Sequence, residues 1–114
     1  MVNRGEIWWA DLPEPTKSEP GYKRPLVIIQ SNSFNRSKIN TVICVVLTSN
    51  LKLEEAPGNF ILSSKSTGLI KDSVLNISQI ITIDKSFLIE KIGELTIKQL
   101  NKLEESLKLV LSIS

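Results

Sequence analysis

The chain of 114 residues contains no histidine and a single cysteine, Cys44. Without histidine, the commonest general acid or base, the commonest metal ligand and every Ser-His-Asp or Cys-His arrangement are excluded. A single cysteine also excludes zinc sites of the usual kind. Because Cys44 lies inside an apolar run, we expect a buried and unreactive thiol rather than a nucleophile or a redox centre.

Glycine-rich phosphate loops and clustered metal ligands are also missing. The five glycines are scattered singly, which excludes a loop of the P-loop or dinucleotide-binding type. The acidic pairs Glu54-Glu55 and Glu104-Glu105 are interpreted as solvated surface rather than as a magnesium site. We therefore expect no metal ion and no cofactor.

Long apolar runs are absent as well. No segment approaches the roughly 18 uninterrupted apolar residues of a membrane helix, and residues 1–6 lack the apolar core of a signal peptide. We therefore expect a cytoplasmic protein that does not bind a membrane. With 41% hydrophobic residues, a chain of this length predicts one globular domain spanning residues 1–114.

The net charge of +2 is small, but it is unevenly distributed along the chain. Residues 1–53 hold seven Lys or Arg and four acids, which gives +3, whereas residues 54–114 hold seven and eight, which gives −1. This distribution predicts a weakly basic face. Ordinary solvated lysines on loops explain it equally well.

Several short β-prone runs predict a mainly β protein. In the first, residues 5–12, side chains alternate between the two faces, so one of Trp8 and Trp9 should lie in the core and the other should be exposed. Residues 13–23 carry three prolines and a glycine, which predicts a loop of about eleven residues. Loops of that length are usually functional or disordered.

Further strands are predicted along the rest of the chain. Near-continuous apolar runs at residues 25–30 and 41–47 are typical of strands buried on both faces, and residues 31–40 between them supply turn chemistry with one short helical turn. Residues 59–62 and 73–83 predict two more strands, on either side of a turn at Thr67-Gly68. Strands at this spacing predict a small barrel.

The last segment changes to a helical period. Its apolar residues on one predicted face are Ile97, Leu100, Leu103, Leu107, Val110 and Leu111. Thr96 followed by Gln99 predicts a capping box, and Leu95 with Leu100 predicts a hydrophobic staple. We therefore expect a C-terminal helix packed on the barrel.

Two of the apolar runs have a polar group at one edge, Arg24 before Pro25 and Thr48 at the end of residues 42–50. If both runs lie in one sheet, the guanidinium and the hydroxyl can share a groove suited to a phosphodiester. Taken singly, each residue has an ordinary explanation, as an exposed charge or as turn chemistry. A chain without histidine can still cleave RNA, because the RNA supplies its own 2′-hydroxyl as nucleophile.

An ordered set of motifs adds to these observations. They lie at residues 4–12, 18–28, 35–36, 46–49, 72–75 and 79–85. At these spacings the chain resembles the MazF/PemK family of toxin endoribonucleases over nearly its whole length. One departure lies near Gln79, where a charged pair of the usual motif is replaced by Ser78 and Ile81, and this affects the details of RNA binding more than activity.

The resemblance implies an SH3-like small barrel of the MazF/PemK/CcdB type with a C-terminal helix, and a homodimer. It further implies the toxin of a toxin–antitoxin pair, which cuts single-stranded RNA at short sequences without a metal. Its small antitoxin should be acidic and partly disordered, so that carboxylates lie where phosphates would sit. The family's essential arginine and threonine correspond to Arg24 and Thr48.

The expected chemistry is attack of a ribose 2′-oxygen on phosphorus, giving a 2′,3′-cyclic phosphate and a 5′-hydroxyl. Arg24 would stabilise the charge that develops, and Thr48 would position the phosphate or relay a proton. Glu19 is the candidate base, or it orients Arg24. The residues expected to bind substrate are Ser18, Pro20, Gly21, Lys23, Ser49, Asn50 and Gln79.

Two other functions remain open. A toxin of the same barrel can poison DNA gyrase, as the related CcdB family does, and residues 109–114 would then form the working surface. The chain ends there without an aromatic anchor or a charge in residues 111–114, which disfavours this function. A non-catalytic SH3-like binding module is the third possibility.

Overall fold

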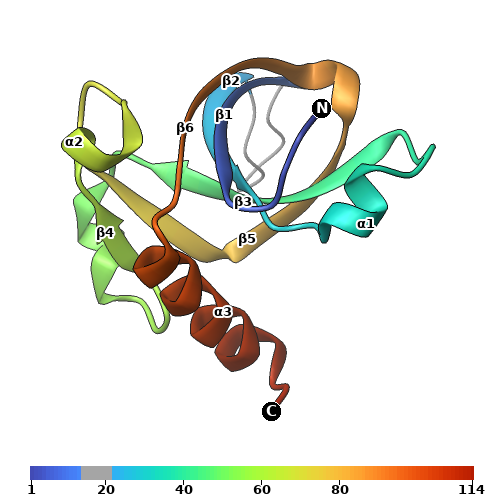
Figure 1. Ribbon diagram of the computed structural model, residues 1–114. Coiled ribbons are helices and arrows are strands. Elements are labelled where there is room, and N and C mark those ends of the chain that lie inside the picture. Colours follow the sequence, from blue (N-terminus) through green and yellow to red (C-terminus); the bar gives the residue numbers. More distant parts are fainter. Residues whose placement is uncertain (14–21) are drawn as a thin grey trace.

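Six antiparallel strands form one curled sheet in the computed structural model, which describes residues 1–13 and 22–114 (Figure 1). The strand order is β4-β5-β3-β2-β1-β6. The strands are β1 Glu6–Leu12, β2 Tyr22–Ile28, β3 Thr41–Thr48, β4 Phe60–Leu62, β5 Ser73–Asp84 and β6 Leu88–Glu94. The helices are α1 Asn32–Asn35, η1 Leu51–Glu55, α2 Ser64–Thr67, η2 Lys85–Phe87 and α3 Ile97–Leu111. This mainly β architecture with a C-terminal helix confirms the predicted fold class.

The sheet buries an apolar cluster on each face. One cluster includes Ile7, Val27 and Val45 and receives Leu103 from α3, whereas the other includes Leu26 and Cys44. Neighbouring residues of β2 and β3 thus point into different clusters, as the period of a strand requires. The predicted burial of these two strands on both faces is confirmed. The predicted burial of Cys44 is confirmed as well, since its side chain is 0% exposed, and this burial raises the pKa of its thiol to about 12.

Strand β6 was not among the predicted strands, although the other five were. It contains three charged residues and Gly93, which weaken the β signal, but it pairs with β1 at one edge of the sheet. Gly93 also touches α2, which follows β4 at the other edge. A Cβ at Gly93 would lie 2.7 Å from the carbonyl oxygen of Thr67. The two edges of the sheet therefore meet where a side chain does not fit.

The two tryptophans do not divide into one core and one exposed residue, so this prediction was wrong. Both are partly buried. Trp8 packs against the cluster of Leu26 and donates its Nε1 hydrogen to Glu6 Oε1 at 3.0 Å. Trp9 faces the other way, and the Lys23 ammonium lies 5.0 Å from its ring centroid. Both tryptophans are partly covered, because Trp8 packs against the apolar cluster on one face of β1 and the Lys23 side chain covers Trp9 on the other face.

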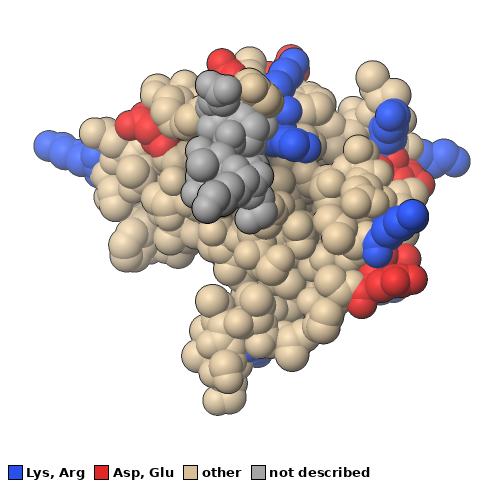
Figure 2. Space-filling view, turned by 180° about the vertical axis from the view of Figure 1, so that it is seen from behind, with Lys and Arg blue, Asp and Glu red and all other residues tan. Residues whose placement is uncertain are grey.

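Helix α3 begins with the predicted capping box. Thr96 Oγ1 accepts from Gln99 N at 3.1 Å, and Gln99 Oε1 accepts from Thr96 N at 2.9 Å. Only the middle of the predicted apolar face is buried: Leu100, Leu103 and Leu107 pack on the sheet. The outer members are exposed, with Ile97 at 81%, Val110 at 40% and Leu111 at 54%. Val110 and Leu111 are exposed because the C-terminal turns project beyond the sheet, where Figure 2 shows a mostly uncharged surface, whereas Ile97 lies at the other end of the helix, in its first turn.

Leu103 and Ile97 allow a matched test of how α3 contributes to stability. Leu103→Ala should lower the free energy of unfolding by about 2–5 kcal/mol, because it leaves a cavity in the core. Ile97→Ala, on the same helix but exposed, should change it by less than about 0.5 kcal/mol. Urea denaturation of both variants measures the difference. Equal effects would mean that α3 is not anchored through Leu103.

A buried carboxylate joins the chain start to β1 and β6. Glu6 is only 4% exposed and accepts hydrogen bonds from Trp8 Nε1 and from Asn3 N, at 3.0 and 2.9 Å. Lys91 Nζ lies 3.1 Å from Glu6 Oε2. Burial alone would raise the pKa of Glu6, but these bonds together outweigh burial and hold its pKa below the ordinary value. The pKa of Lys91 is raised, chiefly by its hydrogen bond to Glu6.

The lowered pKa of Glu6 makes stability depend on pH. Its contribution is complete above the unfolded-state value of 4.5 and is lost as the pH falls through the lower folded-state pKa. The wild type should therefore lose more stability between about pH 5 and pH 3 than Glu6→Gln does. Urea denaturation at several pH values measures this, with Glu90→Gln, at an exposed position of β6, as the control. Parallel curves for wild type and Glu6→Gln would contradict it.

Candidate functional site

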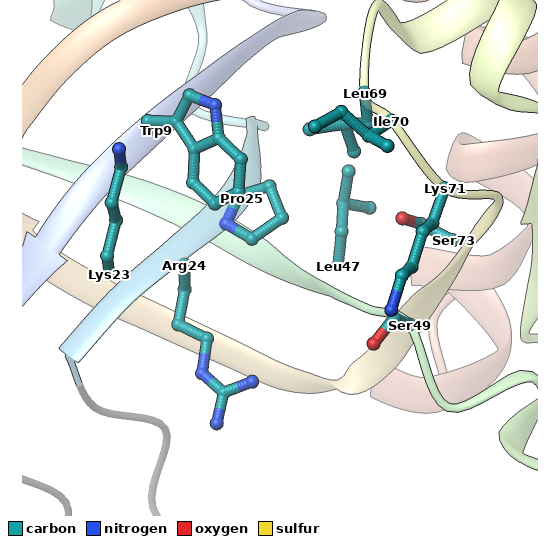
Figure 3. Close-up of a pocket in the computed structure, with 10 residues that line it drawn as sticks. All are labelled: Trp9, Lys23, Arg24, Pro25, Leu47, Ser49, Leu69, Ile70, Lys71 and Ser73. Atoms are coloured by element: carbon teal, nitrogen blue, oxygen red, sulfur yellow. The ribbon is translucent and has the colours of Figure 1, made fainter.

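A cavity of about 330 Å³ opens at one end of β2 and β3, beside the segment between α2 and β5 (Figure 3). Its described lining comprises Trp9, Lys23, Arg24, Pro25, Leu47, Ser49, Leu69, Ile70, Lys71 and Ser73. Three of these residues are cations, and no carboxylate lines the cavity among the described residues. The site therefore combines positive charge with apolar walls.

The apolar walls come from three parts of the fold. Trp9 and Pro25 are direct partners across β1 and β2, and Figure 3 shows them on one side of the cavity. Leu69 and Ile70 lie opposite, and Leu47 of β3 lies between the two sides. The cavity is thus bounded by residues far apart in sequence, which the curl of the sheet brings together.

Arg24 and Thr48 lie at the same end of neighbouring strands. Strands β2 and β3 pair from Ile28–Cys44 to Leu26–Val46, and Arg24 and Thr48 each lie two residues beyond the last of these pairs, at the same end of the two strands. Arg24 is exposed and Thr48 is partly buried. The guanidinium extends past Pro25, away from Trp9 (Figure 3).

The cavity itself is lined by Arg24 but not by Thr48. Ser49, the next residue, contributes to the lining instead, together with the predicted Lys23. The Thr48 hydroxyl accepts a hydrogen bond from Asn50 N at 3.2 Å. The structure therefore brings three predicted residues, Lys23, Arg24 and Ser49, to one cavity and leaves Thr48 beside it.

Asn50 and Gln79 contribute to local structure outside this lining. Asn50 Oδ1 accepts from Lys52 N at 3.3 Å and caps η1. Gln79 lies where β5 bends, and its Oε1 accepts from Asn76 Nδ2 at 3.0 Å. The bend follows from the register, because Val45 pairs with Ile80 while Leu47 pairs with Leu75. Neither side chain is among the residues that line the cavity.

The two departures from the usual motif also have local partners. Ser78 Oγ donates to Asn76 Oδ1 at 3.2 Å, within the polar group that holds the bend of β5. Ile81 packs against the cluster that contains Leu26 and Cys44. The predicted residues Ser18, Glu19, Pro20 and Gly21 lie outside the described residues.

Sequence reasoning missed the wall between α2 and β5. Ile70 is 98% exposed and Lys71 is exposed, and both follow Gly68, which ends α2 with φ of 84°. Nothing in the pattern of residues 69–72 distinguishes them from an ordinary turn. Sequence alone therefore offered no signal for this wall, since single exposed apolar side chains are common on protein surfaces.

The chemistry of the site is that of binding anions and flat apolar groups. Lys23, Arg24 and Lys71 bring three cationic side chains to the cavity. The described residues contain no group of three or more acids, cysteines or histidines placed to hold a metal ion. None of their helices is long and apolar enough to cross a membrane.

The curled antiparallel sheet, its C-terminal helix and its cation-lined cavity define the class of small toxin barrels. The chain belongs to the family of PemK-like, MazF-like toxins of type II toxin–antitoxin systems, which it matches over residues 3–111.

Named relatives agree with this assignment. Endoribonuclease MazF6 of Mycobacterium tuberculosis strain H37Rv is 39% identical over 113 residues, 99% of each chain. A solved endoribonuclease in complex with its cognate antitoxin, from a mycobacterial species, is 25% identical, with a TM-score of 0.75 over 99% of this chain and 95% of that one. MazF from Deinococcus radiodurans has a TM-score of 0.80 at 18% identity over 98% and 97% of the two chains, which supports the fold alone.

Proposed function

We propose that this protein is the toxin of a toxin–antitoxin pair and cuts single-stranded RNA, chiefly mRNA, at specific sequences without a metal ion. The observation that carries the proposal is Arg24 at a cavity whose described lining holds three cations and no acid. Phosphodiesters are the substrates that such a site suits. Relatives that share 39% of its residues are named endoribonucleases, which supports the same class of reaction.

The proposed reaction starts when a ribose 2′-oxygen attacks the adjacent phosphorus. The P–O5′ bond breaks, the 5′-oxygen takes up a proton, and the products are a 2′,3′-cyclic phosphate and a 5′-hydroxyl. Arg24 donates hydrogen bonds to the non-bridging oxygens, where negative charge increases in the transition state. Its guanidinium is not the base, because arginine side chains do not give up a proton in proteins.

Two further groups are assigned by position and by resemblance. Thr48, at the same end of β2 and β3 as Arg24, orients the phosphate or passes a proton. Glu19 takes the proton of the 2′-hydroxyl, or it orients Arg24. Ser18, Pro20 and Gly21 surround Glu19 in sequence and, with Lys23, Ser49, Asn50 and Gln79, are assigned to substrate binding.

The partners follow from the charge of the site. An acidic antitoxin segment would place carboxylates on the cations that otherwise hold phosphates, and so block the site. The solved mycobacterial relative, described as an endoribonuclease with its cognate antitoxin, supports such a partner. Free toxin acting on mRNA in the cytoplasm would arrest growth.

A homodimer is the proposed assembly. The projecting end of α3 exposes Leu109, Val110, Leu111 and Ile113, at 40–60% each. Apolar side chains grouped in this way are typical of surfaces that a partner covers. A two-fold symmetric pair would bury this end of α3 in both copies.

Replacing the proposed transition-state donor tests the reaction directly. Arg24→Ala should lower kcat/KM for a single-stranded RNA about 100- to 1,000-fold, because one preorganised donor is removed. Arg36→Ala removes a charge from an exposed position after α1 and should leave the rate unchanged. Gel analysis of end-labelled RNA measures the rates, and it should detect cyclic phosphate ends with or without EDTA.

Three outcomes would contradict the proposal. They are full activity of Arg24→Ala, complete loss of activity in EDTA, and trapped gyrase–DNA complexes with intact RNA. The third would favour the gyrase poison instead. Binding of RNA without any turnover would favour a non-catalytic module.

The dimer proposal is tested by placing a charge on the exposed end of α3. Leu111→Glu should shift the protein from dimer to monomer, because a carboxylate would be buried in the interface. Asn101→Glu adds the same charge at an exposed position earlier in the helix and should leave the dimer intact. Sedimentation equilibrium measures both. A wild type that is monomeric at all concentrations would refute the proposal.

A further inference from the structure

We propose that the cavity beside Arg24 binds one unpaired nucleobase of the RNA, and that Ile70 and Lys71 make this base a determinant of cleavage specificity. This inference rests on the proposed ribonuclease function. It adds to that function a base-binding subsite, one wall of which is the segment between α2 and β5 across the cavity from Trp9 and Pro25.

The walls of the cavity suit a flat, apolar ligand. Trp9 has the Lys23 ammonium over its ring at 5.0 Å, and Pro25 lies beside it at the cavity. Leu69 and Ile70 face them from across the cavity (Figure 3). Bases of single-stranded RNA are bound in this way, with their faces against aromatic or apolar side chains. The volume of about 330 Å³ is ample for one base.

The segment that carries Ile70 is held at both ends. Asp72 Oδ1 accepts from Ser64 N at 2.8 Å, which ties the end of the segment to the start of α2. Thr67 Oγ1 accepts from Leu69 N at 3.0 Å. The segment therefore presents Ile70 to the cavity from a preorganised turn, although the side chain is 98% exposed. A base seated in the cavity would cover it.

The polar groups at the cavity favour one class of base. Lys71 is a donor only, and Ser49 and Ser73 add hydroxyls, of which Ser73 is almost fully buried. Lysine pairs with the O6 and N7 acceptors of guanine, and the keto oxygen O4 of uracil accepts in the same way. At the ring position where guanine carries O6 and uracil carries O4, adenine and cytosine carry amino groups, which cannot accept from lysine. We therefore expect uracil or guanine at this position.

The strand geometry relates this base to the cleaved bond. Arg24 and Pro25 are consecutive on β2, and both line the cavity. A nucleotide whose base contacts Pro25 would therefore have its phosphate close to the guanidinium. The bound base should accordingly belong to a nucleotide next to the cleaved phosphodiester.

Charge favours RNA over a purely apolar occupant. Lys23, Arg24 and Lys71 surround the apolar walls, and no acid lines the cavity among the described residues. The nearby Asp72 is engaged with the backbone of Ser64 and does not line the cavity. An apolar side chain of an acidic antitoxin would be the competing occupant, and the experiment distinguishes the two.

The first experiment is cleavage of a randomised single-stranded RNA pool followed by sequencing of the fragment ends. Ile70→Ala should lower kcat/KM roughly tenfold, because one wall of the subsite is lost. Lys71→Ala should relax the preference for uracil or guanine at one position next to the cut. Ile89→Ala and Lys65→Ala, at exposed positions away from the cavity, should behave as wild type.

The second experiment measures binding without turnover. In a Trp8→Phe background Trp9 is the remaining tryptophan, and its fluorescence should be quenched by an RNA with 2′-deoxyribose at the cut. An abasic residue beside the cut should remove the quenching. Quenching that survives the abasic change, or that an acidic antitoxin peptide produces while RNA does not, would overturn the inference.

The outcomes separate this inference from the proposed function. If wild type cleaves in an Arg24-dependent manner but Ile70→Ala and Lys71→Ala keep its rate and sequence pattern, the base subsite is refuted and the ribonuclease stands. If wild type cuts no RNA at all, the proposed function itself fails.

Discussion

The pairing of β2 with β3 is the constraint on which the rest of the site depends. Because Leu26 pairs with Val46, both strands end together, and Arg24 and Thr48 reach the same edge. A shift of the register by one residue would move every side chain of β2 to the other face. The two apolar clusters oppose such a shift, since Val27 and Leu26 fill different cores. Core packing thus sets the position of the guanidinium, although Arg24 itself is exposed.

Much of the fold could be predicted from the spacing of the apolar residues, because this spacing indicates which face of a helix or strand is buried. The runs that became β2 and β3 and the capping box of α3 were predicted from sequence alone. Strand β6 was not predicted, since its apolar residues are interrupted by charges and its partner, β1, lies about 80 residues away. The spacing of apolar residues in α3 also predicted more burial than the structure shows, because this spacing does not indicate where a helix extends beyond the sheet on which it packs.

The residues of the site also divide into those that the sequence predicts and those that it does not. Lys23, Arg24 and Ser49 lie at the ends of predicted strands. When such strands are predicted to share a sheet, the residues at their ends are also predicted to lie close together. Ile70 and Lys71 reach the cavity through tertiary contacts of α2, which local sequence does not encode. The segment of Ile70 and Lys71 was therefore not predicted from sequence, whereas Lys23 and Arg24 were. Sequence therefore predicts the charged groups of such a site better than it predicts the shape of the ligand.

Gly93 shows how the barrel is closed. Strand β4 and strand β6 are the two ends of the strand order, and the end of α2, which follows β4, packs closely on Ile92 and Gly93 of β6. Because Gly93 has no side chain, the two edges of the sheet approach each other closely there. Any larger group there would hold the seam apart and carry the segment after α2, with its exposed isoleucine, away from Trp9. A substitution at Gly93 would accordingly change the shape of the cavity, although Gly93 does not line it.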